Sequence, residues 1–176
     1  MGRAVVLLGA PGSGKSSVGH ELGLLGLRWR EWEPELLARW GGREGFIAHK
    51  QAALAEHHGE LLTFVDADHA PAILESTGIS DAEFIDKLQE REDTFVVRLD
   101  VSEAGALRRI AARSSGRHLS DELEANRRVW AAFNQLVVPN RPVNFVVDTE
   151  EAATAAIALE ILESLDGQGS ERAKVY

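Results

Sequence analysis

Short apolar runs alternate with segments of helical periodicity along the whole chain. Residues 4–8 (AVVLL) are apolar without interruption, which is typical of a strand buried on both faces of a parallel sheet. The spacing then becomes helical, with Val18, Leu22 and Leu25 on one stripe before Gly26. Similar apolar runs predict further strands over residues 27–32, 72–76, 94–99 and 144–147.

Helical patterns fill the stretches between these strands. Pro34 suits the first turn of a small helix that runs to Trp40, and a longer helix begins at Arg43 after two glycines. Residues 61–66 either end that longer helix or form a strand, and the pattern leaves both open. Further helices are predicted over residues 81–90, 103–113, 121–136 and 150–165.

The alternation of strands and helices predicts an α/β fold. We expect a three-layer parallel β-sheet of about five strands flanked by helices. The 176 residues, 44% of them apolar, suffice for one sizeable core. No internal repeat or linker divides the chain, so we predict a single domain over residues 1–176.

Charge and composition limit the kinds of molecule that the protein is expected to bind. The net charge of -9 argues against general nucleic-acid binding, which needs a basic face. The chain has no cysteine, so disulfides and thiolate chemistry are absent, and no run is long enough to span a membrane. We therefore expect a cytoplasmic protein that does not bind membranes, and its composition fits a monomer or a homodimer.

The first apolar run leads directly into a glycine-rich loop. Residues 9–16 (GAPGSGKS) satisfy the pattern G-x-x-x-x-G-K-[ST] between a predicted strand and a predicted helix. Such a loop wraps a phosphate with backbone N–H groups at a helix N-terminus. Lys15 is expected to neutralise the outer phosphates, and Ser16 to ligate Mg²⁺. The loop therefore predicts binding of ATP and Mg²⁺ by Gly12, Ser13, Gly14, Lys15, Ser16 and Ser17.

Nucleotide binding alone does not decide the activity. The guanine-reading NKxD motif and the DxxG motif are both absent, and the chain is short for a mechanical ATPase. A kinase that phosphorylates a hydroxyl of a small metabolite or antibiotic is therefore favoured. Two alternatives stay open: a nucleoside-monophosphate kinase, and a nucleotide-binding regulatory module with little turnover.

Carboxylates near predicted strand ends are candidates for the acceptor and metal chemistry. Glu31 and Glu33, two residues apart on a predicted strand, would point the same way and orient or deprotonate the acceptor hydroxyl. Glu75 ends an apolar strand before Thr77-Gly78, as an acid that holds Mg²⁺ and faces the acceptor would. Asp66 competes for this metal role.

Arginines and other side chains complete the candidate set. Arg113 and Arg117 flank Ser-Ser-Gly, which suits a small lid around residues 113–121 that closes over ATP. Arg43 follows two glycines and is a candidate for binding an anionic acceptor. A weaker pattern is formed by residues 57–58 and 66–69, whose histidines and aspartates either bind a metal or lie in solvated loops. Solvated loops are the favoured interpretation. Three tryptophans, Trp29, Trp32 and Trp40, either stack on an acceptor ring or pack in the core, as does Trp130.

Several of these segments together resemble one branch of the P-loop kinases. Residues 9–23 (GAPGSGKSSVGHELG) are similar to the opening of the shikimate kinase and gluconate kinase group, within the nucleoside-monophosphate-kinase-like proteins. Residues 97–119 resemble that group's passage from the fourth strand into the lid. The resemblance implies phosphoryl transfer from ATP, with Arg117 closing on the phosphates, Arg109 stacking on adenine, and Thr149 in the purine-contacting turn.

The same resemblance has departures that bear on the acceptor. Shikimate kinases have Gly-Gly-Gly after the third strand, where this chain has residues 75–78 (ESTG). Their Phe-Arg pair appears here as Phe46-Ile47, so one arginine expected to grip a carboxylate is missing. Arg141 is a candidate to replace another substrate-binding arginine. The acceptor is therefore expected to differ from shikimate.

Overall fold

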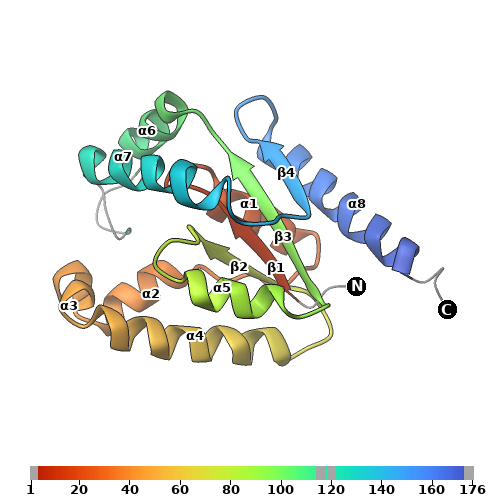
Figure 1. The fold of residues 1–176 in the computed structure, drawn as a ribbon, viewed down its shortest axis with the longest axis horizontal. Coiled ribbons are helices and arrows are strands. Elements are labelled where there is room, and N and C mark those ends of the chain that lie inside the picture. Colours follow the sequence, from red (N-terminus) through yellow and green to blue (C-terminus); the bar gives the residue numbers. More distant parts are fainter. Residues whose placement is uncertain (1–3, 114–117, 119–121, 173–176) are drawn as a thin grey trace.

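Four parallel strands form the sheet in the computed structural model, which describes residues 4–113, 118 and 122–172, with side chains up to residue 167. Their order across the sheet is β2-β1-β3-β4 (Figure 1), so the chain steps from β1 to one neighbour and later returns to the other. This confirms an α/β fold with a parallel sheet flanked by helices. The strands are β1 (Ala4–Leu8), β2 (Ala72–Ser76), β3 (Thr94–Asp100) and β4 (Phe145–Asp148).

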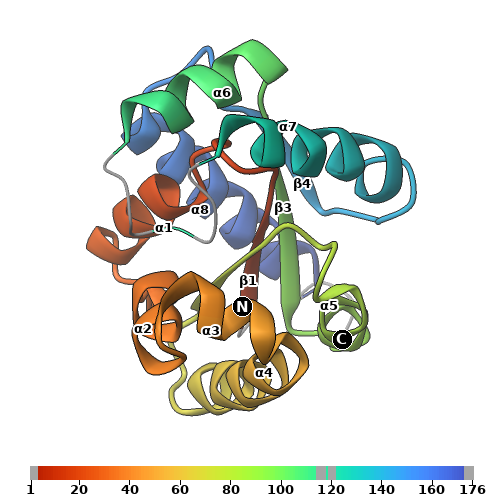
Figure 2. The same ribbon diagram turned by 90° about the vertical axis from the view of Figure 1, so that its left-hand side faces the viewer.

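Helices connect the strands and cover the sheet. Figure 2 shows α2 and α3 beside α4, whereas α6 and α7 lie against each other in a separate group. The π-helical turn η1 directly continues α7 before the two prolines that precede β4. The helical elements are α1 (Lys15–Leu24), α2 (Trp32–Arg39), α3 (Gly42–Ala48), α4 (Lys50–Asp66), α5 (Ala82–Gln89), α6 (Glu103–Ala112), α7 (Leu123–Ala132), η1 (Phe133–Val137) and α8 (Thr154–Arg172).

Alternate residues of the central strand enter two different apolar clusters. Val6 and Leu8 pack with side chains of α4, α5 and η1, whereas Val5 and Leu7 pack with side chains of α1 and α8. All five residues of β1 are fully buried. This burial on both faces explains the uninterrupted apolar run, and it makes β1 a rigid support for the loop that follows.

The predicted strand over residues 27–32 is the main difference from the sequence-based map. Only Arg28 pairs with the sheet, through an isolated parallel bridge to Ala72, and α2 already begins at Trp32. The segment is rich in charge, and Pro34 lies in the first turn of α2, where its missing N–H is tolerated. The chain therefore leaves the sheet edge after one bridge, and the described sheet has four strands rather than about five.

Residues 61–66 and the helix predicted from Arg43 are also settled by the structure. Residues 61–66 are the last turns of α4, so the helical alternative is correct. The single long helix is divided into α3 and α4 at His49, whose φ of -119° is not helical. The division lets α2, α3 and α4 enclose a small apolar cluster of Leu36, Leu37, Phe46 and Ala53.

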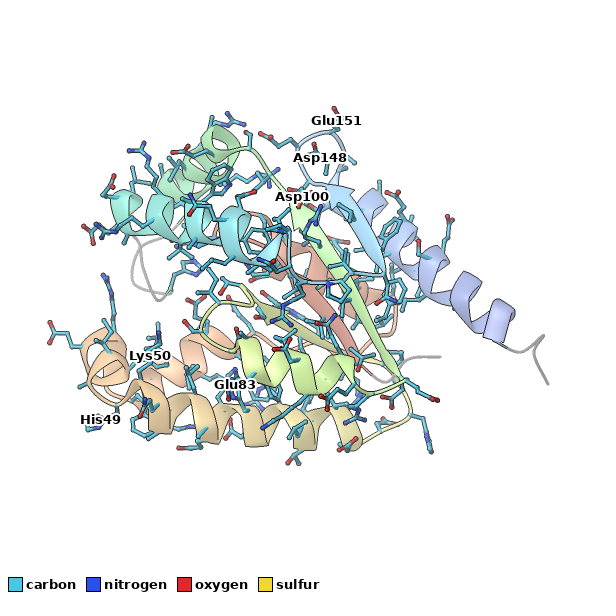
Figure 3. All side chains as sticks on the ribbon, viewed as in Figure 1. His49, Lys50, Glu83, Asp100, Asp148 and Glu151 are labelled. Atoms are coloured by element: carbon cyan, nitrogen blue, oxygen red, sulfur yellow. The ribbon has the colours of Figure 1, made fainter. Side chains whose placement is uncertain are left out.

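The carboxyl ends of all four strands meet at one edge of the sheet. Leu8 pairs in register with both Ser76 and Arg98, and Asp100 pairs with Asp148 (Figure 3). The glycine-rich loop follows β1, so it lies centrally on this edge, between the turns after β2 and β3. In open α/β sheets this is the edge at which ligands bind.

Candidate active site

The loop between β1 and α1 has the backbone conformation that phosphate binding requires. Gly12 and Gly14 have φ values of 80° and 89°, in the left-handed region that other residues rarely adopt. Gly14 is also the N-cap of α1 and supplies no side chain to bond the first N–H groups of the helix. These N–H groups and the helix dipole therefore favour an anion at the loop.

Lys15 is held at the base of this loop. Its ammonium group donates to the carbonyl oxygens of Gly9 at 2.8 Å and Ala10 at 3.1 Å. Burial lowers the pKa of Lys15, while the negative charges of Glu75, Glu33 and Asp81 act in the opposite direction. The loop thus contains a fixed, partly buried cation surrounded by carboxylates, as a site for a polyanion with a divalent cation would.

Glu75 connects the end of β2 with the loop. Its Oε2 accepts a hydrogen bond of 2.7 Å from the Ser16 hydroxyl, and its Oε1 accepts one of 2.8 Å from the Trp29 indole N–H. Burial raises the pKa of Glu75 despite these two hydrogen bonds and the nearby Lys15. A hydroxyl and a carboxylate side by side are the hard oxygen donors that Mg²⁺ prefers, so this pair fits a magnesium ion.

Asp66, the competing acid, lies elsewhere. It is the last residue of α4 and forms an ion pair of 3.1 Å with Arg91, which also bonds Asp93 just before β3. These residues lie at the amino ends of the strands, opposite the loop. The structure therefore brings Glu75, and not Asp66, to the phosphate loop.

Glu31 and Glu33 do not lie on a strand, so the argument that they share one strand face is wrong. Glu31 is the N-cap of α2, and Glu33 lies in the first turn of that helix. Glu33 nevertheless lies near enough to Lys15 and Glu75 for its charge to raise the pKa of both. Glu31 lines a shallow depression with Ser16, Ser17 and Trp29.

Arg109 and Thr149 are brought together from α6 and the turn after β4. The Arg109 guanidinium donates to the Thr149 hydroxyl at 2.9 Å and to the Gly12 carbonyl at 3.3 Å. Thr149 is buried and donates in turn to the Asp100 carbonyl at the end of β3. Both residues therefore border the loop, although their contacts with adenine stay a prediction.

Of the two arginines predicted for the lid, the structure describes Arg113. Arg113 follows α6, and its positive charge lowers the pKa of Lys15, so it lies near the phosphate loop. Arg117 lies outside the described residues, as does most of the lid range 113–121. His118, which is described, has its Nδ1 3.3 Å from Glu33 Oε2, so the lid range meets the start of α2.

The two arginines predicted for acceptor binding have different surroundings. Arg141 is only 9% exposed and donates to Asp86 at 2.6 Å and to Gln89 at 2.8 Å, so it is tied to α5. Arg43 is exposed near the start of α3. Their roles stay predictions, and the engagement of Arg141 means that a substrate contact would require it to leave α5.

The weaker patterns have structural explanations. In the part of the chain that the structure describes, no group of three or more His, Cys, Asp or Glu side chains could hold a metal. Trp29, Trp32 and Trp130 pack against the two clusters beside the sheet, and Trp40 packs against the cluster of α2, α3 and α4. All four tryptophans therefore pack against apolar clusters, and stacking on an acceptor ring stays a prediction.

Three side chains near the site were not identified from the sequence, and a fourth, Trp29, was considered only for acceptor stacking or core packing. Trp29 contacts Glu75, His118 contacts Glu33, and Asp81, before α5, influences Lys15. Arg128 lines an open hollow between the turn after β2 and α7, together with Thr77 and Ser80. Only the position of Asp81 at the start of the helix predicted after the strand 72–76 could have pointed to it, because the other three depend on long-range packing. Lys50, which Figure 3 labels at the start of α4, donates a hydrogen bond of 3.1 Å to the Ser80 hydroxyl.

Similar folds occur in solved kinase structures. No protein-family model matches the sequence, and no curated protein is significantly similar to it. A shikimate kinase from Acinetobacter baumannii in complex with shikimate superposes with a TM-score of 0.71 at 20% identity, covering 94% of this chain and 93% of that chain. A gluconokinase from Sinorhizobium meliloti gives 0.64 at 21% identity over 98% and 97%. A deoxyadenosine kinase from M. mycoides with bound dATP gives 0.58 at 19% identity over 91% and 99%.

These relatives define the class of fold. The structural neighbours are P-loop kinases of small molecules, which confirms the resemblance noted in the sequence at the level of the fold. At about one identical residue in five, the similarity extends no further than the fold. Among the described residues, no helix has both the length and the apolar composition needed to cross a membrane.

Proposed function

We propose that this protein is an ATP- and Mg²⁺-dependent kinase that phosphorylates a hydroxyl group of a small molecule. One observation carries the proposal: the complete phosphate loop presents Lys15 and Ser16, and Ser16 is bonded to Glu75 at the end of the neighbouring strand. The three solved structures described above, named as a shikimate kinase, a gluconokinase and a deoxyadenosine kinase, support the same activity.

The nucleotide would be held by the loop and by the residues next to it. The backbone N–H groups of residues 12–17 and Lys15 would bind the phosphates, while Arg109 and Thr149 would border the adenine. Ser16 and Glu75 would hold Mg²⁺, which screens the phosphate charges during transfer. Arg113 and Arg117 would add positive charge from the lid range. The deoxyadenosine kinase with dATP gives a precedent for a nucleotide in this fold.

The acceptor would approach from the side of α2. In the transfer step the acceptor oxygen bonds the γ-phosphorus, the bond from that phosphorus to the bridging oxygen breaks, and ADP leaves with the bond's electrons. The hydroxyl proton would pass to Glu33, whose charge already acts on Lys15 and Glu75. Glu31, Arg43 and Arg141 are further candidates for acceptor contacts. Ile47, where shikimate kinases have arginine, favours an acceptor other than shikimate.

An ADP-release assay tests this proposal. Purified protein with Mg-ATP is offered polyols, sugar acids, nucleosides, nucleotides and aminocyclitol antibiotics, one at a time. We expect at least one hydroxyl-bearing acceptor to raise ADP formation above the rate without acceptor. Lys15→Ala should lower that rate by about 100-fold, because it removes a charge that stabilises the transferring phosphoryl group.

Controls and other outcomes separate the alternatives. Lys87→Ala, which removes an exposed lysine of α5, should leave the rate unchanged. Activity restricted to nucleoside monophosphates would identify a nucleoside-monophosphate kinase. Nucleotide binding without turnover on any acceptor would contradict the kinase proposal and favour a regulatory module.

A further inference from the structure

The Trp29 side chain makes a specific contact with the proposed metal-binding acid. Its indole N–H donates to Glu75 Oε1 at 2.8 Å, while the other oxygen, Oε2, is bonded to the Ser16 hydroxyl. The two carboxylate oxygens therefore have separate tasks: one is tied to Trp29, and the other faces the phosphate loop. A carboxylate anchored at one oxygen cannot turn freely about its terminal bond.

The surface of α1 is shaped to admit this indole. A Cβ atom at Gly19 would lie 2.3 Å from Trp29 Nε1 and 3.2 Å from Glu75 Oε1, and one at Gly23 would lie 3.3 Å from Trp29 Cβ. Each glycine inside a helix costs about 1 kcal/mol relative to alanine. Two glycines one turn apart on the face that meets Trp29 therefore weaken α1 but allow the indole to reach Glu75.

The backbone next to Trp29 is fixed from two directions. The Arg28 main chain bonds Pro71 O and Ile73 N, which ties it to the start of β2. The Arg28 guanidinium donates to the carbonyl oxygens of Phe64 and Val65 in the last turn of α4 and to that of Ala70 in the loop before β2. Trp29 therefore extends from an immobilised residue, so its indole is held in place before any ligand binds.

We propose that Trp29 is a positioning residue for Mg²⁺-dependent nucleotide binding. The Trp29 indole holds Glu75 with Oε2 directed toward Ser16. It also connects Glu75 to the segment that leads into α2. This inference rests on the proposed function, because it assumes that the loop binds a nucleotide with Mg²⁺. It goes beyond that proposal by giving a role to a residue outside the phosphate loop.

Calorimetric titration with a non-hydrolysable ATP analogue tests the inference. The Kd is measured with excess Mg²⁺ and again with EDTA, and the ratio of the two values reports how much Mg²⁺ strengthens binding. Trp29→Phe keeps an aromatic ring but removes the N–H donor. We expect this ratio to fall about tenfold in Trp29→Phe, while the Kd in EDTA stays within about twofold of the wild-type value.

Two further variants exclude a general structural effect. Trp130→Phe removes an indole N–H that donates to the Val101 carbonyl at 3.2 Å, and it should retain the wild-type ratio. Gly19→Ala keeps Trp29 but places a methyl group against its N–H, and it should lower the ratio as Trp29→Phe does. The methyl group displaces the indole without removing it, and alanine has the higher helix propensity, so the variant gives a second, independent test of the contact.

The outcomes distinguish the inference from the proposed function. A Trp29→Phe ratio equal to that of the wild type would overturn the role of Trp29 and leave the kinase proposal intact. Equal weakening with and without Mg²⁺ would also overturn it, because it would indicate only a packing role. Absence of analogue binding by the wild-type protein would instead refute nucleotide binding itself.

Discussion

His57 shows how the environment of a single residue makes stability depend on pH. It lies on α4 with its ring against Trp32, and its Nδ1 is buried without a hydrogen-bond partner in the described structure. Burial lowers the pKa of His57, and the neighbouring His58 lowers it further. Glu60 and Asp81 oppose this shift, whereas Arg39 adds to it.

The sign of the effect follows from proton linkage. The folded-state pKa of His57 is below its ordinary value of 6.5, so the unfolded chain binds the proton more readily as the pH falls through about 6.5. The free energy of unfolding should therefore decrease below that pH. Urea denaturation at pH 7.5, 6.5 and 5.5 should show a smaller decrease for His57→Gln than for the wild type.

His69→Gln serves as the control, because His69 is exposed in the loop before β2. It should reproduce the wild-type decrease. Burial lowers the pKa of His58 as well, so some decrease should persist in His57→Gln. A His57→Gln profile parallel to that of the wild type would refute the assignment.

At the scale of elements, Arg28 ties the segment between α1 and α2 to the rest of the molecule. It is the only residue of the predicted strand 27–32 that bridges to β2, and its guanidinium donates to the Phe64 and Val65 carbonyl groups at the end of α4. Charge-assisted bonds to a helix C-terminus are favourable, since the helix dipole is negative there. Arg28 alone therefore holds this segment against β2 and α4, where a full strand was expected.

Replacing Arg28 should destabilise the protein more than replacing its neighbour Arg30. Arg28→Met leaves partly buried carbonyl groups without a donor, which should cost about 2 kcal/mol. Arg30 forms an exposed ion pair with Glu35, so Arg30→Met should cost at most about 1 kcal/mol. Urea unfolding of both variants measures the difference, and equal losses would contradict the anchoring role of Arg28.

At the scale of the whole molecule, nucleotide binding should stabilise the fold, because the proposed site joins distant elements. The loop after β1, Arg109 of α6 and Thr149 after β4 are already in contact. A ligand at 100 times its Kd adds about 2.7 kcal/mol. For a chain of this size, that corresponds to a rise in Tm of about 5–10 °C.

Thermal unfolding with and without Mg-ATP measures this effect. The rise should be largely lost in Lys15→Ala, because the loop loses its fixed cation. A wild-type Tm that does not respond to millimolar Mg-ATP would contradict nucleotide binding. An equal rise in wild type and Lys15→Ala would place the nucleotide away from the phosphate loop.

Local sequence patterns determined much of this protein. The strand, loop and helix around residues 4–24, the parallel α/β fold and the position of Glu75 at a strand end all follow from periodicity and turn chemistry over a few neighbouring residues. These features depend on backbone conformation and burial, which short stretches of sequence encode directly. The choice between Asp66 and Glu75 was already beyond that reach.

Only the tertiary structure decided which side chains meet. Trp29 and Glu75 are 46 positions apart, Arg141 and Gln89 are 52 apart, and His118 and Glu33 are 85 apart. Such pairs depend on how helices pack across the sheet, and no periodicity along the chain specifies that packing. The same packing explains why the expected strand over residues 27–32 is a single bridge at Arg28. Hydrogen bonds from Arg28 to α4 and from Trp29 to Glu75 hold this segment in place without a ladder of strand hydrogen bonds.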